Sequence, residues 1–211
     1  MANIKESIRT FKDKFLQQGI ELKEAFNSLA GDAIVQVFYS QNRENESPLC
    51  IEKGNCHHVP ILGIKFRMQS GRKILLYDSN SFSDYGGTCG IDIKELEVIT
   101  LIEGQEEMSA DYQWRDLVNV KIKYIKLIWL DDDGWEVPGE VNKSMGIFPH
   151  GIEMKFENGR TIFILVAEPD GYDEAEERYN YLRGGEELII AFNEIAAKKQ
   201  KLIIEGIDLE L

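Results

Sequence analysis

The sequence predicts an α+β protein that is mainly antiparallel β-sheet, with an N-terminal helix and two internally duplicated β units. Three observations predict this class. Apolar residues recur at helical spacing near the N-terminus, strand-like alternation with glycine-containing turns follows, and one hairpin pattern, GIxFxMxxGRxI, returns at an offset of 88 residues. With 43% hydrophobic residues in 211, the chain carries enough apolar side chains for a core, which excludes a disordered class.

The N-terminal segment keeps helical spacing in its apolar residues, which are Ile4, Ile8, Phe11, Phe15 and, after Gly19, Leu22, Phe26 and Leu29. We expect a helix, or a helix broken at Gly19, over Asn3 to Leu29. Asn3 followed by Glu6 is an N-cap pattern, and Gly31 is suited to the C-terminal stop.

The first β unit begins with a segment rich in β-branched and aromatic residues, AIVQVFYS, which predicts a strand. Polar residues follow, and then alternation on both sides of Ser70-Gly71 predicts a hairpin. After a loop rich in glycine and serine, the segment GIDIKELEVITLIEG predicts one or two further short strands.

The second β unit follows the same order. A strand over KIKYIKLIWL precedes a polar loop and a hairpin that turns at Asn158-Gly159. We expect residues 168–185, EPDGYDEAEERYNYLRGG, to form an acidic loop, and Glu186 to Phe192 to form a strand. A short helix over Asn193 to Lys199 and an edge strand in the tail complete the prediction.

The two hairpins support an internal duplication because they match without gaps. Five of seven aligned positions are identical, and the aligned pairs are Gly63 and Gly151, Ile64 and Ile152, Phe66 and Met154, Met68 and Phe156, Gly71 and Gly159, Arg72 and Arg160, and Ile74 and Ile162. We divide the chain into a helical segment (1–31), a first β unit (32–104) and a second β unit (117–211). Each unit alone would expose an apolar sheet face, so we expect the two to pack as one globule.

Charge and processing patterns limit the function classes. The net charge of −13 argues against binding to nucleic acid or to an anionic membrane, because both select clustered lysine and arginine, and it permits a basic protein partner. The N-terminus has no signal-peptide pattern and no apolar stretch reaches membrane-spanning length, so we expect a cytoplasmic protein. Its three cysteines fit reduced thiols better than disulfides.

No motif assigns a metal, a cofactor or a catalytic activity. Cys50, Cys56, His57 and His58 lie close in sequence, but their spacing does not match a structural zinc site, and a loop that enters the first hairpin is the preferred interpretation. The aspartates of DDDGWEVPGE are consecutive, unlike the alternating ligands of a calcium-binding EF-hand. The glycines lack phosphate-binding patterns, and no nucleophile has a histidine and an acid in a recognisable motif.

Clustered acids with interspersed aromatics are the best candidates for a binding surface. Aromatic anchors surrounded by polar residues are typical of protein interfaces, and the acids would steer a basic partner. A merely solvated surface, with Trp135 against the core, is the alternative. The candidate residues are Asp131, Asp132, Asp133, Trp135, Glu136, Asp170, Tyr172, Asp173 and Tyr179.

The segment GIEMKFENGRTIFILVAE, with GGEELIIAFNEIAAKK downstream, resembles the closing part of uncharacterised bacterial proteins, some of which are similar to immunity proteins of polymorphic toxin systems. The resemblance spans Gly151 to Lys199 and is carried by the hairpin pattern. It implies a bacterial, cytoplasmic, non-enzymatic protein that binds and blocks a toxin, and it assigns no functional residues.

Three functional hypotheses follow from the sequence. The first is a non-enzymatic module, an immunity-type inhibitor that binds a basic toxin through its acidic loops. The second is a small-ligand-binding protein or enzyme with a pocket between the β units, near His57, His58 and His150. The third is a structural homodimer subunit that pairs through the tail LIIEGIDLEL.

Overall fold

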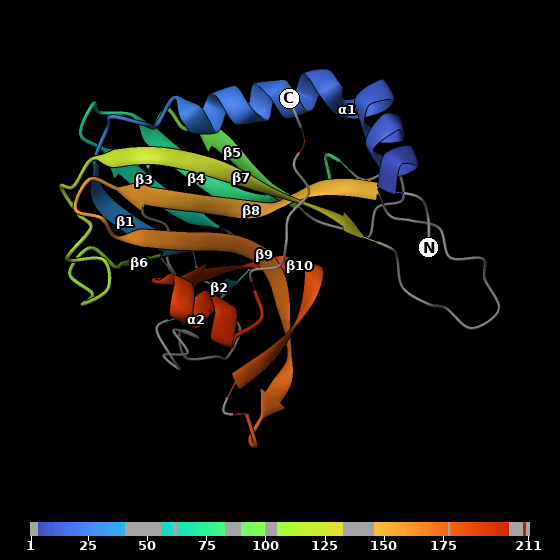
Figure 1. The fold of residues 1–211 in the computed structure, drawn as a ribbon. Helices are drawn as coiled ribbons and strands as arrows, with labels where there is room; N and C mark the ends of the chain where they lie inside the picture. The colour runs from blue at the N-terminus through green and yellow to red at the C-terminus, as the bar shows by residue number, and fades with distance from the viewer. Residues whose placement is uncertain are drawn as a thin grey trace.

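The computed structural model describes residues 4–40, 56–60, 63–82, 90–99, 105–132, 146–176, 178–202 and 209. Within them the chain forms two helices and two antiparallel sheets, which confirms the α+β class (Figure 1). Sheet 1 has the strand order β5-β4-β3-β1-β6, and sheet 2 has the order β2-β10-β9-β8-β7. The elements are α1 Ile4–Asn27, β1 Ile34–Ser40, β2 Cys56–Pro60, β3 Ile64–Met68, β4 Lys73–Ser79, β5 Gly90–Glu95, β6 Gln105–Glu107, β7 Ile122–Asp132, β8 Gly146–Phe156, β9 Thr161–Asp173, β10 Arg178–Ala191 and α2 Glu194–Lys199.

Helix α1 runs continuously through Gly19, so of the two expected forms the unbroken helix is the one observed. A glycine inside a helix costs about 1 kcal/mol relative to alanine, and burial of the flanking apolar residues offsets this cost. Phe11 packs against Trp129 of β7, with ring centroids 5.1 Å apart, and against Phe82, at 6.1 Å. The helix contacts β7 and β8 of sheet 2 and β5 of sheet 1, so it covers parts of both β units.

The two sheets share one apolar core. Their facing sides contribute aliphatic and aromatic residues to a single cluster, which α1 extends with Phe11, Leu22 and Phe26. The centre of the cluster consists of fully buried residues at equivalent positions of the two hairpins: Ile64, Phe66, Ile74 and Leu76 from sheet 1, and Ile152, Met154, Ile162 and Ile164 from sheet 2. Each sheet therefore buries the apolar face of the other.

The strand order and register reproduce the predicted duplication. The meander β1-β3-β4-β5 in sheet 1 corresponds to β7-β8-β9-β10 in sheet 2. Tyr39 pairs with Ile64 in the first meander and Leu127 pairs with Ile152 in the second, so both partners shift by 88. The irregularity in β1 between residues 34 and 36 recurs in β7 between residues 122 and 124, at the same offset.

Hydrogen bonds outside the strands follow the same offset. The Gly31 N–H donates to the Ile122 carbonyl oxygen and the Asn119 N–H donates to the Ile34 carbonyl oxygen, each at 2.8 Å. These reciprocal bonds cross-link the entrances of β1 and β7. The end of α1, with the buried Phe26, is matched by the turn around the buried Trp114, so the repeat includes residues that precede position 117.

The structure corrects the prediction for residues 56–60, which are not part of a loop. They form strand β2, which pairs with β10 from Ala191 opposite Cys56 to Glu187 opposite Pro60. The first half of the chain therefore contributes an edge strand to the sheet of the second half. A five-residue strand with adjacent histidines and a terminal proline lacks the alternating pattern on which strand prediction depends.

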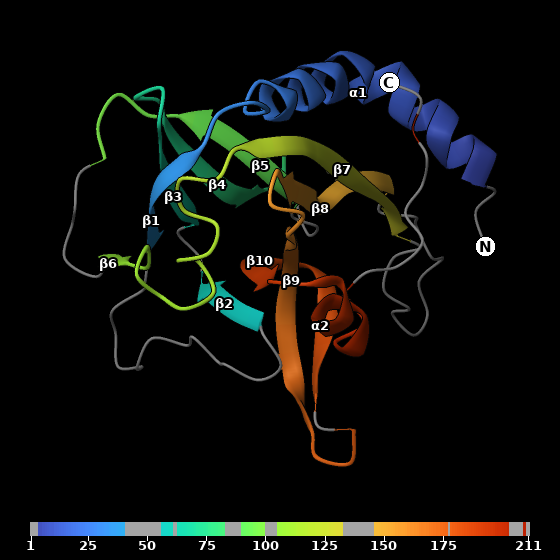
Figure 2. The same ribbon diagram turned by 60° about the vertical axis from the view of Figure 1, so that its left-hand side comes forward.

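The end of the described chain agrees with the sequence. Glu186 to Phe192 lies largely in β10, and α2 begins after Asn193, whose side chain accepts a hydrogen bond from the Ala196 N–H at 2.8 Å. Ala196 and Ala197 pack α2 onto the outer face of sheet 2 (Figure 2). The tail expected to form an edge strand lies mostly outside the described residues, within which Leu209 is part of the core.

We predict that Gly63 and Gly151 are required at equivalent positions because a neighbouring strand passes too close for a side chain. A Cβ atom would lie 2.1 Å from the Leu76 carbonyl oxygen at Gly63 and 2.4 Å from the Ile164 carbonyl oxygen at Gly151. Replacing Gly151 by alanine should lower the free energy of unfolding by about 1–3 kcal/mol, measured by urea denaturation. The control Gly159→Asn lies at an open turn and should change it by less than about 0.5 kcal/mol. Wild-type stability of Gly151→Ala would contradict this prediction.

Candidate functional site

Sheet 2 divides into two ribbons at one point in its register. Pairing between β8 and β9 ends at Gly151 opposite Leu165. Beyond this pair, β7 and β8 continue together to Asp132 opposite Gly146, and β9 and β10 continue to Asp173 opposite Arg178. The second ribbon projects from the body of the molecule (Figure 1). We call residues 168–187, its two strands and connecting turn, the acidic ribbon.

The acidic ribbon is a correction to the sequence prediction, which treated residues 168–185 as a loop. Cross-strand pairs continue through most of it, with Tyr172 opposite Tyr179 and Leu182 opposite Glu168. The turn is confined to the few residues after Asp173, whose Oδ1 accepts hydrogen bonds from the Ala175 and Glu176 N–H groups at 3.0 and 3.1 Å. The dense acids, glycines and proline concealed the strands because those residue types are depleted in sheets.

A wide irregularity in β10 lies at the base of the acidic ribbon. Arg183 pairs with Ala167, yet the next pairing of β10 with β9 is Leu188 opposite Val166, so residues 184–187 are inserted opposite a continuous strand. Gly185 lies so close to β9 that a Cβ atom there would be 2.4 Å from the Cβ atom of Glu168. Bulges of this kind bend a strand and increase its twist. The double glycine therefore allows the ribbon to leave the sheet.

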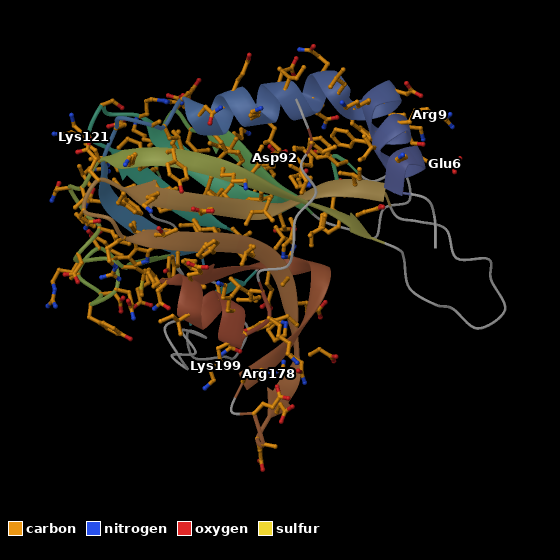
Figure 3. The ribbon with its side chains drawn as sticks, viewed as in Figure 1. Glu6, Arg9, Asp92, Lys121, Arg178 and Lys199 are labelled. Carbon is orange, nitrogen blue, oxygen red and sulfur yellow. The ribbon has the colours of Figure 1, made fainter. Side chains whose placement is uncertain are left out.

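Arg178 links residues near the tip of the acidic ribbon. Its side chain is labelled in Figure 3, and the residue is 8% exposed. The Nε atom donates to a Glu176 carboxylate oxygen, and Nη1 donates to the Asn180 Oδ1 atom at 2.6 Å. The hydrogen bond from Arg178 and its charge, together with the charge of Lys201, lower the pKa of Glu176. Lys201 Nζ lies 3.7 Å from the same carboxylate, so the tip is also tied to the residues after α2.

The predicted partner-binding residues fall into two groups. Asp170, Tyr172, Asp173 and Tyr179 all lie on the acidic ribbon, where Asp170 is exposed and Asp173 is half-buried. The ribbon adds exposed carboxylates that sequence reasoning did not single out: Glu168, Glu174 and Glu176. The alternation of YNYL after the acidic turn is the signal from which a strand could have been predicted there, but it was interpreted as part of a loop.

The other predicted residues do not join this group. Asp131 and Asp132 end β7 on the separate β7–β8 ribbon, opposite Ile147 and Gly146. Asp133, Trp135 and Glu136 lie outside the described residues. The described part of the predicted surface is therefore concentrated on the acidic ribbon.

The three histidines proposed to line a pocket are not gathered. His57 and His58 lie on β2, whereas His150 lies on β8, and both β9 and β10 separate these strands in the sheet. His150 is 1% exposed, with its ring 6.1 Å from that of Phe148. In the described part of the chain, the buried apolar side chains of the two sheets form one continuous cluster.

Cys56 is enclosed in the apolar cluster beneath α2, and this burial raises the pKa of its thiol to about 12. The other two cysteines, Cys50 and Cys89, lie outside the described residues. Among the described side chains, no three of the types histidine, cysteine, aspartate and glutamate gather closely enough to hold a metal ion.

Comparisons of the chain with protein-family models, with curated proteins and with solved structures gave no match. Neither helix in the described part of the chain combines the length and the apolar composition needed to cross a membrane. The evidence for the candidate site is therefore its geometry. It is an acidic ribbon held at its base by a bulge and near its tip by a buried arginine.

We predict that Arg178 orders the acidic ribbon without supporting the core. In Arg178→Ala, Glu176 and Asn180 lose a charged donor, which should lower the local stability of the ribbon. Hydrogen exchange of amides in residues 168–183 should become faster, while exchange in β3 and β4 stays unchanged. Lys201→Ala removes only the longer contact to Glu176 and serves as the control. Unchanged protection of the ribbon in Arg178→Ala would refute this role.

A second prediction concerns Cys56, which becomes the only thiol in a Cys50→Ser/Cys89→Ser variant. Its raised pKa leaves very little thiolate at pH 8, and the thiolate is the form that reacts. Iodoacetamide should therefore alkylate the native protein much more slowly than the urea-unfolded protein at the same pH, as measured by mass spectrometry. Equal rates in the two states would contradict the burial of this thiol.

Proposed function

We propose that this protein is a cytoplasmic, non-enzymatic binding module whose acidic ribbon docks on a basic protein. The most concrete form of this proposal is an immunity-type inhibitor that covers the basic surface of a toxin. One observation carries it: a projecting, braced ribbon displays exposed carboxylates at Glu168, Asp170, Glu174 and Glu176. A pre-ordered ribbon loses little conformational entropy on binding, and its negative potential accelerates encounter with a positively charged partner.

The alternative of a ligand pocket or enzyme between the β units receives less support. A binding pocket requires a concave site with a few convergent polar groups. The apolar cluster shared by the two sheets and the separation of His150 from His57 and His58 both speak against such a site in the described residues. Pairing of two chains through the tail is also less supported, because Leu202 and Leu209 pack into the protein's own apolar clusters.

Affinity capture from the native lysate tests the proposal. The tagged protein is compared with Asp170→Lys/Glu174→Lys on the ribbon and with Asp13→Lys/Glu24→Lys on the exposed face of α1, which changes the net charge equally. We expect a stoichiometric basic protein to bind the wild type at low salt and to dissociate as salt rises, because screening weakens surface electrostatics. The ribbon variant should lose this partner and the helix variant should keep it, as measured by mass spectrometry of the bound fraction.

Equal capture by both variants would refute the ribbon as the binding surface. Capture of nothing at either salt, combined with a metabolite that raises Tm, would favour the pocket alternative instead.

A further inference from the structure

The outer faces of the two sheets differ although the meanders are equivalent. On sheet 2, Phe163 pairs with Ala191 and Leu165 pairs with Ile189, and all four are buried in the cluster that includes α2. At the equivalent positions of sheet 1, Leu75 pairs with Lys94 and Tyr77 pairs with Asp92. Here Leu75 and Tyr77 stay half-buried and Lys94 is exposed. No described helix occupies this face of sheet 1.

The part of this face that β3, β4 and β5 form is basic, in contrast to the net charge of the chain. Arg67 pairs with Lys73, and Lys65 pairs with Leu75, so basic side chains lie in adjacent rows across β3, β4 and β5. We call this surface the basic face: Lys65, Arg67, Lys73, Leu75, Tyr77 and Lys94.

Two acids on the outer side of sheet 1 accept hydrogen bonds within the protein. Asp92, labelled in Figure 3, accepts a hydrogen bond from the Tyr77 hydroxyl at 3.3 Å, and Glu107 accepts one from the Gln36 side chain at 3.1 Å. Phe38 is buried on this side next to β6, whereas no described helix covers β3 to β5. Basic side chains therefore flank the half-buried Leu75, whereas Tyr77 lies beside Asp92.

We propose that the basic face binds an acidic amphipathic helix of a partner protein, in the way that α2 covers sheet 2. The equivalence of the two meanders supports a helix as the ligand. The corresponding surface of sheet 2 already binds α2, whose small residues Ala196 and Ala197 pack onto it. Charge complementarity gives the chemistry, since apolar residues of the helix would cover Leu75 and Tyr77 while flanking carboxylates meet Arg67 and Lys94.

Two other sources of a helix fit less well. The α2 helix of a second copy ends in Lys198 and Lys199, and these would meet the lysines of the basic face with like charge. The α1 helix of a second copy is buried on its apolar side against β7, β8 and β5. The partner is therefore a different chain with an acidic helix, and its surface is separate from the acidic ribbon.

Fluorescence anisotropy with three labelled helical peptides tests this inference. The probe carries alanine and leucine on one face and glutamate on both flanks. One control peptide replaces glutamate by lysine, and the other replaces alanine and leucine by serine. We expect only the probe to bind, and we expect Arg67→Glu/Lys94→Glu to weaken it about tenfold or more, because two attractive contacts become repulsive. The matched variant Lys126→Glu/Lys155→Glu, on the outer side of sheet 2, should bind the probe as the wild type does.

Each alternative gives a distinct result. Equal binding of the serine peptide, or displacement of the probe by an oligonucleotide of the same charge, would reduce the surface to a general anion site and overturn the proposal. The proposal would also be overturned if the probe bound no more tightly than the control peptides at concentrations up to about 1 mM, the range of very weak binding. Self-association in light scattering that Arg67→Glu/Lys94→Glu abolishes would assign the face to a second copy. Urea denaturation confirms that each variant is folded, and Asp170→Lys/Glu174→Lys should still bind the probe, which separates this test from that of the acidic ribbon.

Discussion

Neither meander can bury its own inner face, and this constraint determines the rest of the structure. Each four-stranded meander has one side of large apolar residues, which water would contact in an isolated unit. The equivalent residues Phe66 and Met154 lie in the same core, so each sheet is the cover of the other. The reciprocal hydrogen bonds of Gly31 and Asn119 hold the entrances of β1 and β7 together, and α1 covers parts of both sheets.

Because the inner faces are committed to each other, the two repeats differ on their outer faces and edges. Sheet 2 carries α2 and the edge strand β2, and its β9 and β10 extend far beyond the pairing with β8. Sheet 1 has shorter strands and a basic outer face. Binding surfaces at these positions do not require any change in the shared core, which is a common arrangement in proteins that carry function on a stable scaffold.

The sequence predicted the parts of the fold that have regular periodicity. Alternation and glycine turns located both hairpins, and the gapless match of Gly63 with Gly151 located the repeat, because these features follow directly from local backbone geometry. It did not predict β2, whose short segment is a strand only because β10 offers an edge. It placed Asp170 and Asp173 among the candidates but mistook their ribbon for a loop, since pairing with a distant strand overrides the low β-propensity of acidic residues. The separation of Asp131 from Asp170 depends on the division of sheet 2, which no local pattern encodes.

The net charge of −13 does not prevent an acidic helix from binding to the basic face. Charges act over a Debye length of about 8 Å at physiological ionic strength, and two packed sheets are about 10 Å apart. A ligand on the outer side of sheet 1 is therefore influenced mainly by Arg67, Lys94 and their neighbours, while carboxylates of the acidic ribbon, such as Asp170, belong to the other sheet. The two proposed binding surfaces, one for a basic partner and one for an acidic partner, can then work independently on one small domain. The core that separates the two surfaces is the same core that joins the repeats.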